Sequence, residues 1–179
     1  MKYFEEIQFA MDWLGERPDT IFLGQTVGCP GTFMYPTLSG VDINKRLEFP
    51  VNESFQMQFT LGLALAGYVP ISVYPRQNFL LLTISDLVNM IDKIPALTNK
   101  EIEPKLIIRT ATGPDSPIHP GHQHVGDFTE AFKKMFTNGI DVIQVNEAVD
   151  IVPAYKYAYQ RRDCKSTLII ENGNLYRNG

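Results

Sequence analysis

The sequence predicts an α/β domain of three layers, in which a mainly parallel sheet carries helices on both faces. Segments with the apolar pattern of buried strands alternate with segments of helical periodicity along the chain. The length of 179 residues suits one domain better than two. Hydrophobic residues make up 44% of the chain and charged residues 20%, which is enough apolar material for a buried core.

The first half of the chain is expected to supply two helices and three strands. In the opening segment Ile7, Met11 and Leu14 follow steps of four and three, the spacing of one helix face. A loop dense in glycine and proline follows the first strand. The expected elements are the helix Met1–Glu16, the strand Thr20–Leu23, the loop Gly24–Pro36, the strand Arg46–Val51, the helix Ser54–Gly67 and the strand Val69–Tyr74.

The second half continues this alternation. We expect Pro95 to end a helix, because proline lacks the backbone N–H that a helix interior needs. The expected elements are the helix Phe79–Ile94, the strand Lys105–Thr110, the loop Ala111–Gly126, the helix Asp127–Asn138, the strand Asp141–Val145, the helix Glu147–Arg161 and the strand Thr167–Glu171. Since open parallel sheets bind ligands at the carboxyl ends of their strands, the loops after the strands are the informative ones.

Composition argues against several classes of function. Sixteen Lys and Arg residues against 20 Asp and Glu residues give a net charge of −4, so we expect no nucleic-acid partner. The apolar stretches are too short to cross a bilayer, and Glu5 and Glu6 stand where a secretory signal would be apolar. We therefore expect no membrane contact and a cytoplasmic protein. Cys29 and Cys164 are far apart and form no disulfide framework.

Glu53 is the first candidate for a chemical role. It follows a predicted strand and opens a helix that has almost no charge. Burial disfavours the charged form of a carboxyl group, which suits such a group to hold or pass a proton. The alternative is a structural role in the first helical turn, where the helix dipole stabilises an acid. The pattern by itself favours this structural role.

A single glycine- and proline-rich loop holds all three histidines, His119, His122 and His124. Imidazoles at this spacing could bind zinc, but no cysteine lies near them in the sequence. Solvated loop histidines are therefore the favoured interpretation, and we predict no metal ligand; one histidine acting at a strand end is a third alternative. Phe79, which opens the next helix, is by default a core aromatic residue.

Five stretches of the chain follow one another in an order and at spacings that chance does not explain. They are Phe22-Leu23-Gly24-Gln25-Thr26-Val27-Gly28, Pro50-Val51-Asn52-Glu53, Gly62–Pro70, the helix from Phe79-Leu80-Leu81-Leu82 to Lys93, and Gly121-His122-Gln123-His124. Together they resemble the pyrimidine-binding, transketolase-like domain of thiamine diphosphate-dependent enzymes. The resemblance is strongest to the N-terminal domain of the beta subunit of 2-oxo acid dehydrogenases of the pyruvate and branched-chain types, and it covers nearly the whole chain.

The resemblance implies roles for five residues. Glu53 would hydrogen-bond a pyrimidine nitrogen of the cofactor and set its tautomer, and Phe79 would stack on the pyrimidine face. His124 would act in the channel near the substrate or the acyl acceptor. Gln25, which stands where the family has an acid, and Val51 would also lie against the cofactor. With the resemblance in view, the functional role of Glu53 is favoured over the structural one.

The resemblance also implies what must accompany the chain. The family's second domain of comparable size finds no counterpart in the sequence, and Gly126-Asp127-Phe128 departs from the Gly-Asp-Gly motif that holds diphosphate and magnesium. We expect residues 1–179 to form a single pyrimidine-binding domain. It would need an alpha-type subunit that carries the diphosphate-binding domain and the Mg²⁺, and two copies would pair as a dimer.

The expected function is that of a beta-type subunit acting on a 2-oxo acid through thiamine diphosphate. Three alternatives stay open. A transketolase-like subunit would transfer a ketol group from a ketose. A subunit of the same fold could serve assembly or regulation without catalysis, an interpretation that Gln25 and the missing domain motivate. An α/β binding protein with a histidine metal site is the third.

Overall fold

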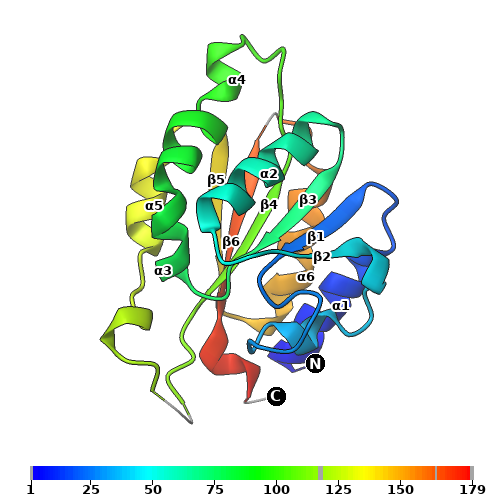
Figure 1. Cartoon of the computed structure of the whole chain (residues 1–179), viewed down its shortest axis with the longest axis vertical. Helices are drawn as coiled ribbons and strands as arrows, with labels where there is room; N and C mark the ends of the chain where they lie inside the picture. The colour runs from blue at the N-terminus through cyan, green and yellow to red at the C-terminus, as the bar shows by residue number, and fades with distance from the viewer. Residues whose placement is uncertain (1, 117–118, 164, 178–179) are drawn as a thin grey trace.

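A six-stranded sheet in which every pairing is parallel forms the middle layer of the structure, with the strand order β2-β1-β3-β4-β6-β5 (Figure 1). The structure is a computed structural model that describes residues 2–116, 119–163 and 165–177. The strands are β1 (Thr20–Gly24), β2 (Arg46–Glu48), β3 (Val69–Val73), β4 (Ile107–Thr112), β5 (Ile140–Val145) and β6 (Ser166–Asn172). The predicted α/β class is confirmed.

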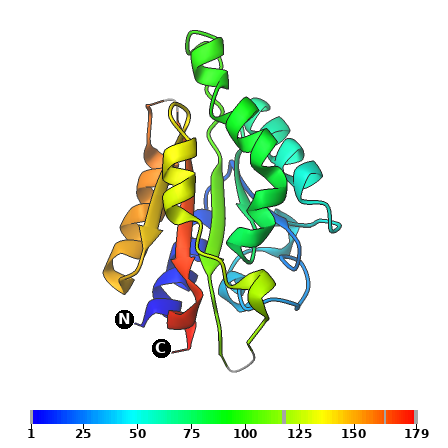
Figure 2. The same ribbon diagram turned by 90° about the vertical axis from the view of Figure 1, so that its left-hand side faces the viewer.

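Helices cover both faces of this sheet. They are α1 (Tyr3–Gly15), α2 (Glu53–Leu65), α3 (Gln77–Leu80), α4 (Ile94–Leu97), α5 (Thr129–Met135) and α6 (Ala148–Gln160). Buried residues of α1 and α6 share one hydrophobic core with the sheet, and those of α2, α3 and α5 share a second core on the opposite face. Figure 2 shows α1 and α6 on one side of the sheet and α2 and α3 on the other. The three layers are therefore as predicted.

Short helical turns connect these elements. They are η1 (Tyr35–Leu38), η2 (Ile43–Lys45), η3 (Leu81–Thr83), the π-helical η4 (Asp86–Ile91), η5 (His122–His124) and η6 (Gly173–Tyr176). No helix of the described ranges is both long and apolar enough to pass through a lipid bilayer.

Predicted and observed elements differ most between residues 77 and 97. The expected helix Phe79–Ile94 is a series of short turns, and Pro95 lies in the first turn of α4 instead of ending a helix. The π-helical turn ends at Ile91, and the carboxylate of the next residue, Asp92, accepts the backbone N–H groups of Asn138 at 3.0 Å and Gly139 at 2.9 Å. Contacts between this segment and residues distant in the sequence therefore take the place of the regular helix that was expected. Strand β4 also begins two residues later than expected, at Ile107.

Candidate functional site

Loops that follow β1, β3 and β4 meet at the carboxyl edge of the sheet, the lower end of the sheet in Figure 1. Glu48, at the end of β2, folds the loop after β1. Its carboxylate accepts the backbone N–H of Thr26 at 2.6 Å and that of Gly28 at 2.7 Å. Because this edge collects the ends of parallel strands, side chains from distant parts of the sequence meet there.

The first pair of predicted site residues is Gln25 and Glu53. The side-chain amide of Gln25 donates a hydrogen bond to Oε1 of Glu53 at 3.3 Å. Glu53 is the first residue of α2 and is only 8% exposed. Asn52 makes the helix cap, because its side chain accepts the N–H of Phe55 at 3.0 Å. The carboxyl group of Glu53 is therefore not needed as a cap and points toward the loop after β1.

Polar groups that the sequence analysis missed surround the start of α2. Asp86 accepts hydrogen bonds from the hydroxyl of Ser54 at 2.6 Å and from the amide of Gln58 at 3.1 Å. The hydroxyl of Tyr74 donates to the backbone carbonyl of Glu53 at 3.1 Å. Burial raises the pKa of Tyr74 well above its ordinary range, so Tyr74 stays a neutral donor. These contacts fix the helix turn that carries Glu53.

The second pair is Phe79 and His124, whose ring centroids lie 5.5 Å apart at an interplanar angle of 46°. Arg76 holds His124 in place, because its Nη1 donates to the carbonyls of Gly113 at 2.8 Å and of His124 at 2.9 Å. Burial lowers the pKa of Arg76 from its ordinary value. The buried Nδ1 of His124 has no hydrogen-bond partner in the described part of the chain.

Gln77 connects the segment after β3 to the beginning of α5. Its side-chain oxygen accepts the backbone N–H of Phe128 at 2.5 Å, and its amide donates to the hydroxyl of Thr129 at 3.1 Å. Asp127 accepts the N–H of the same threonine at 3.0 Å. Burial alone would raise the pKa of Asp127, but the hydrogen bonds from Thr129 outweigh it and lower that pKa. This framework fixes the segment from Arg76 to Phe79.

Phe79 and His124 line a cavity of about 490 Å³ at this edge. Its other walls come from the loops after β1 and β4, the segment after β3 and the last described residue, namely Gly31, Thr32, Phe33, Pro75, Arg76, Pro114, Ser116 and Arg177. Glu53 is not among the lining residues; it is buried beside Tyr74, which precedes the lining residue Pro75 in the chain. The two predicted pairs thus lie at one edge of the sheet, and the cavity contains only the second.

Other sequence predictions find less support in the geometry. Val51, expected beside the cofactor, is 79% exposed in the loop between β2 and α2. The rings of His119 and His122 lie 6.2 Å apart. Within the described ranges, no group of three His, Cys, Asp or Glu side chains could hold a metal ion, and Cys29 is free and exposed. Cys164 lies outside the described residues.

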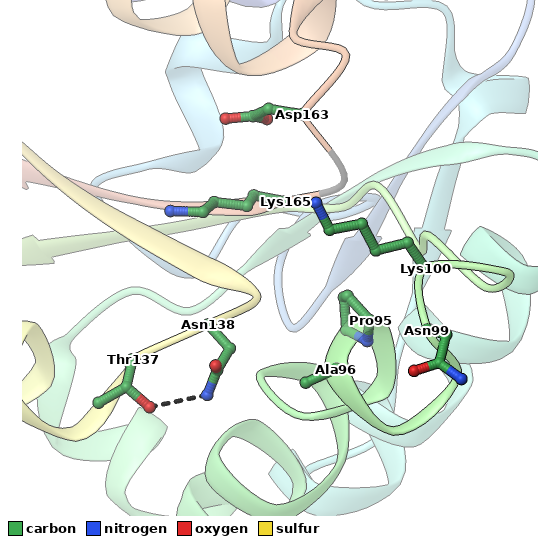
Figure 3. A pocket seen from close by; sticks show the side chains of 8 residues that line it. All are labelled: Pro95, Ala96, Asn99, Lys100, Thr137, Asn138, Asp163 and Lys165. Atoms are coloured by element: carbon green, nitrogen blue, oxygen red, sulfur yellow. Dashed lines mark hydrogen bonds between the residues drawn. The ribbon is translucent and has the colours of Figure 1, made fainter.

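Another cavity, of about 580 Å³, lies at the opposite edge of the sheet, among the segments that lead into β4, β5 and β6. Figure 3 shows Lys100 and Lys165 among the residues that line it, with Thr137 and Asn138 at the lower left of the view. Lys165 pairs with Asp141 at 2.9 Å. None of the predicted site residues lines this cavity, so the candidate site remains the carboxyl edge.

No protein-family model and no curated protein matches this sequence. Two solved structures are similar in fold. A split-gene transketolase, described as an inactive beta4 tetramer, aligns with a TM-score of 0.71 at 14% identity, over 96% of this chain and 51% of its own. A 2-oxoglutarate:ferredoxin oxidoreductase from Magnetococcus marinus, with 2-oxoglutarate, coenzyme A and succinyl-CoA bound, aligns with a TM-score of 0.57 at 16% identity. That alignment covers 98% of this chain and 29% of the other.

This chain therefore spans about half the length of the first protein and under a third of the second. Both likenesses extend over nearly all of this chain. They confirm the transketolase-like fold that the five sequence stretches led us to expect.

Proposed function

We propose that this chain is the pyrimidine-binding subunit of a thiamine diphosphate-dependent enzyme that acts on a 2-oxo acid. One observation carries the proposal: Glu53 is 8% exposed at the carboxyl edge of the sheet, where the amide of Gln25 donates a hydrogen bond to its carboxyl group. A carboxyl group in such surroundings can exchange a proton with a ring nitrogen. The expected role of Glu53 is thus consistent with its position.

The residues present fit a flat, nitrogen-containing ring. Oε1 of Glu53 accepts the hydrogen bond from Gln25, while Oε2 accepts none from the described residues and is available to a ring nitrogen. Phe79 is half-buried and lines the neighbouring cavity, so its ring can stack against an aromatic heterocycle. Bound thiamine diphosphate would supply the reactive carbon that adds to the substrate carbonyl.

The residues of this chain would then position the cofactor ring and the substrate. Glu53 would hold or give a proton at the ring nitrogen, and Phe79 would fix the plane of the ring. His124 lies beside Phe79 in the same cavity, where it can hydrogen-bond a substrate oxygen. We assign the substrate to the 2-oxo acids because the sequence motifs resemble that branch, and the similar ferredoxin oxidoreductase holds 2-oxoglutarate.

The proposed enzyme needs a second subunit that carries the diphosphate site and Mg²⁺. The outer face of α2 offers a surface for it, since Phe55 and Phe59 are 48% and 40% exposed and pack beside Phe49. A hollow of about 380 Å³ lies between these rings and Gly62. The transketolase of similar fold is described as inactive when it is a tetramer of beta subunits, which supports a requirement for a partner.

Turnover by the assembled complex tests the proposal. The chain is co-expressed with a diphosphate-binding subunit, and decarboxylation of pyruvate and branched-chain 2-oxo acids is compared with ketol transfer from sugar phosphates. Glu53→Gln should lower 2-oxo acid turnover at least about a hundredfold, the usual size of a proton-transfer contribution. Glu130→Gln, the same change on the exposed surface of α5, is the control.

Equal turnover by the wild-type and Glu53→Gln complexes would remove Glu53 from the chemistry. Activity on sugar phosphates alone would replace decarboxylation by ketol transfer. A complex that assembles and turns over none of these substrates would favour an assembly or regulatory role.

A further inference from the structure

The cavity beside Phe79 and His124 contains two arginines, Arg76 and Arg177, and no carboxylate among its lining residues. None of the ion pairs formed by the described residues involves either arginine. Two guanidinium groups that form no ion pair, beside a histidine, favour the binding of an anion in this cavity. Neither arginine was singled out by the sequence motifs.

Arg76 is held by hydrogen bonds to backbone carbonyls and forms no ion pair with any described residue. Its Nη1 donates to the carbonyls of Gly113 and His124, and its guanidinium carbon lies 5.8 Å from the ring centroid of Phe33. Asp115 is the acid whose charge acts on Arg76, but its carboxylate forms no ion pair with Arg76 and accepts a hydrogen bond from the side-chain amide of Asn174 at 3.4 Å. Arg76 thus contributes a fixed positive field.

Arg177 lies on a wall that is anchored in the core. The preceding residue, Tyr176, donates its hydroxyl hydrogen bond to Glu171, which pairs with Arg109 at 2.9 Å in a fully buried ion pair. The ring of Phe33 packs edge-on against Tyr176 with centroids 5.2 Å apart. The backbone of Arg177 is therefore held firmly, while its side chain is exposed and lines the cavity.

We propose that Arg177 binds the anionic group of the substrate, with Arg76 supporting it through its field. A guanidinium group matches carboxylate and phosphate oxygens with paired hydrogen bonds. The inference rests on the proposed function and deepens it, because the anion would be held in the cavity that also contains Phe79 and His124. For a 2-oxo acid the bound group is the carboxylate; for a sugar phosphate it is the phosphate.

Binding of simple anions to the whole chain tests this inference without cofactor or turnover. Pyruvate, ribose 5-phosphate and, as a neutral probe, ribose are titrated into the wild-type chain and followed by backbone amide shifts in NMR at low salt. Arg177→Gln should weaken binding of the preferred anion about tenfold or more, the loss expected for a charge-assisted hydrogen bond. Arg162→Gln, an exposed arginine on the opposite edge, should change it less than about twofold.

Wild-type affinity in Arg177→Gln would overturn the inference, as would ribose binding as tightly as ribose 5-phosphate or no binding of either anion. Preference for pyruvate or for ribose 5-phosphate supports the anion site and identifies which group it takes. Anion binding without cofactor binding by the assembled complex would overturn the proposed function alone, so the two failures are distinguishable.

Discussion

The amide of Gln25 donates a hydrogen bond to the carboxylate of Glu53 across 3.3 Å and joins the loop after β1 to the first turn of α2. The two residues are 28 positions apart in the sequence. A neutral amide at position 25 leaves Glu53 as the one carboxylate of the pair. An acid at position 25 would put two like charges within hydrogen-bond distance, so Gln25 sets the charge of this part of the site.

Replacing Gln25 by Ala should lower the free energy of unfolding by about 1 kcal/mol, because a partly buried hydrogen bond is lost. Urea denaturation measures the change. The control is Gln160→Ala at the exposed end of α6, which should shift stability by less than about 0.5 kcal/mol. If the two variants have the same free energy of unfolding, the contact between Gln25 and Glu53 does not contribute to stability.

Two glycines should respond in opposite directions to the same substitution. Gly24 has φ +151, and a Cβ there would lie 2.4 Å from the backbone oxygen of Val73. Gly24→Ala should therefore cost about 2 kcal/mol or more. Gly62 lies in α2 with open space around it, so Gly62→Ala should stabilise the isolated chain by up to about 1 kcal/mol. Thermal unfolding of both variants tests this contrast, and destabilisation by Gly62→Ala would contradict it.

Asp92 should make stability depend on pH in the acid range. Burial alone would raise its pKa, but the hydrogen bonds from Lys93 and from the backbone of Asn138, Thr137 and Gly139 outweigh it and lower the pKa to about 2. Since the pKa in the folded state lies below the unfolded value, the stabilisation is complete above about pH 4 and is lost as the pH falls toward 2. The shift corresponds to about 2 kcal/mol.

Asp92→Asn should therefore lower the free energy of unfolding by about 2 kcal/mol at pH 7, with the difference from wild type shrinking below pH 4. Denaturation series between pH 2 and pH 7 measure it. Asp150→Asn on the exposed face of α6 serves as control. A difference from wild type that stays constant over this range would show that the charge of Asp92 is not the cause.

The buried pair Arg109–Glu171 should behave as a unit. Its side chains are both 0% exposed, and Tyr155 and Tyr176 also donate to Glu171. Arg109→Met or Glu171→Gln alone leaves an unpaired buried charge and should cost about 3 kcal/mol or more. The double variant removes both charges and should cost clearly less than the sum. Additive losses in urea denaturation would contradict this coupling.

The sequence predicted the regular elements well because apolar periodicity follows burial directly. Helices α1 and α6 and all six strands lie within a few residues of their predicted bounds. The segment after β3 was predicted poorly, because its form depends on contacts of Asp86 and Asp92 with residues distant in sequence. Local periodicity does not contain such information.

The site was predicted to the same extent. That extent covers location alone: Glu53, Gln25, Phe79 and His124 lie in two pairs at one sheet edge, and their roles toward a cofactor or substrate stay predictions. The exposed position of Val51 was not foreseen. Nor were Arg76 and Arg177; their only sequence signal is that Arg76 comes soon after β3, and Arg177 directly follows η6, the turn after β6.

Binding of thiamine diphosphate tests the central claim most directly. The complex with the diphosphate-binding subunit is titrated with thiamine diphosphate and Mg²⁺ by calorimetry, using wild type, Glu53→Ala and the surface control Glu130→Ala. The account predicts that Glu53→Ala weakens binding about tenfold or more, while the control binds as wild type does. Equal affinity in all three proteins would contradict the contact between Glu53 and the cofactor.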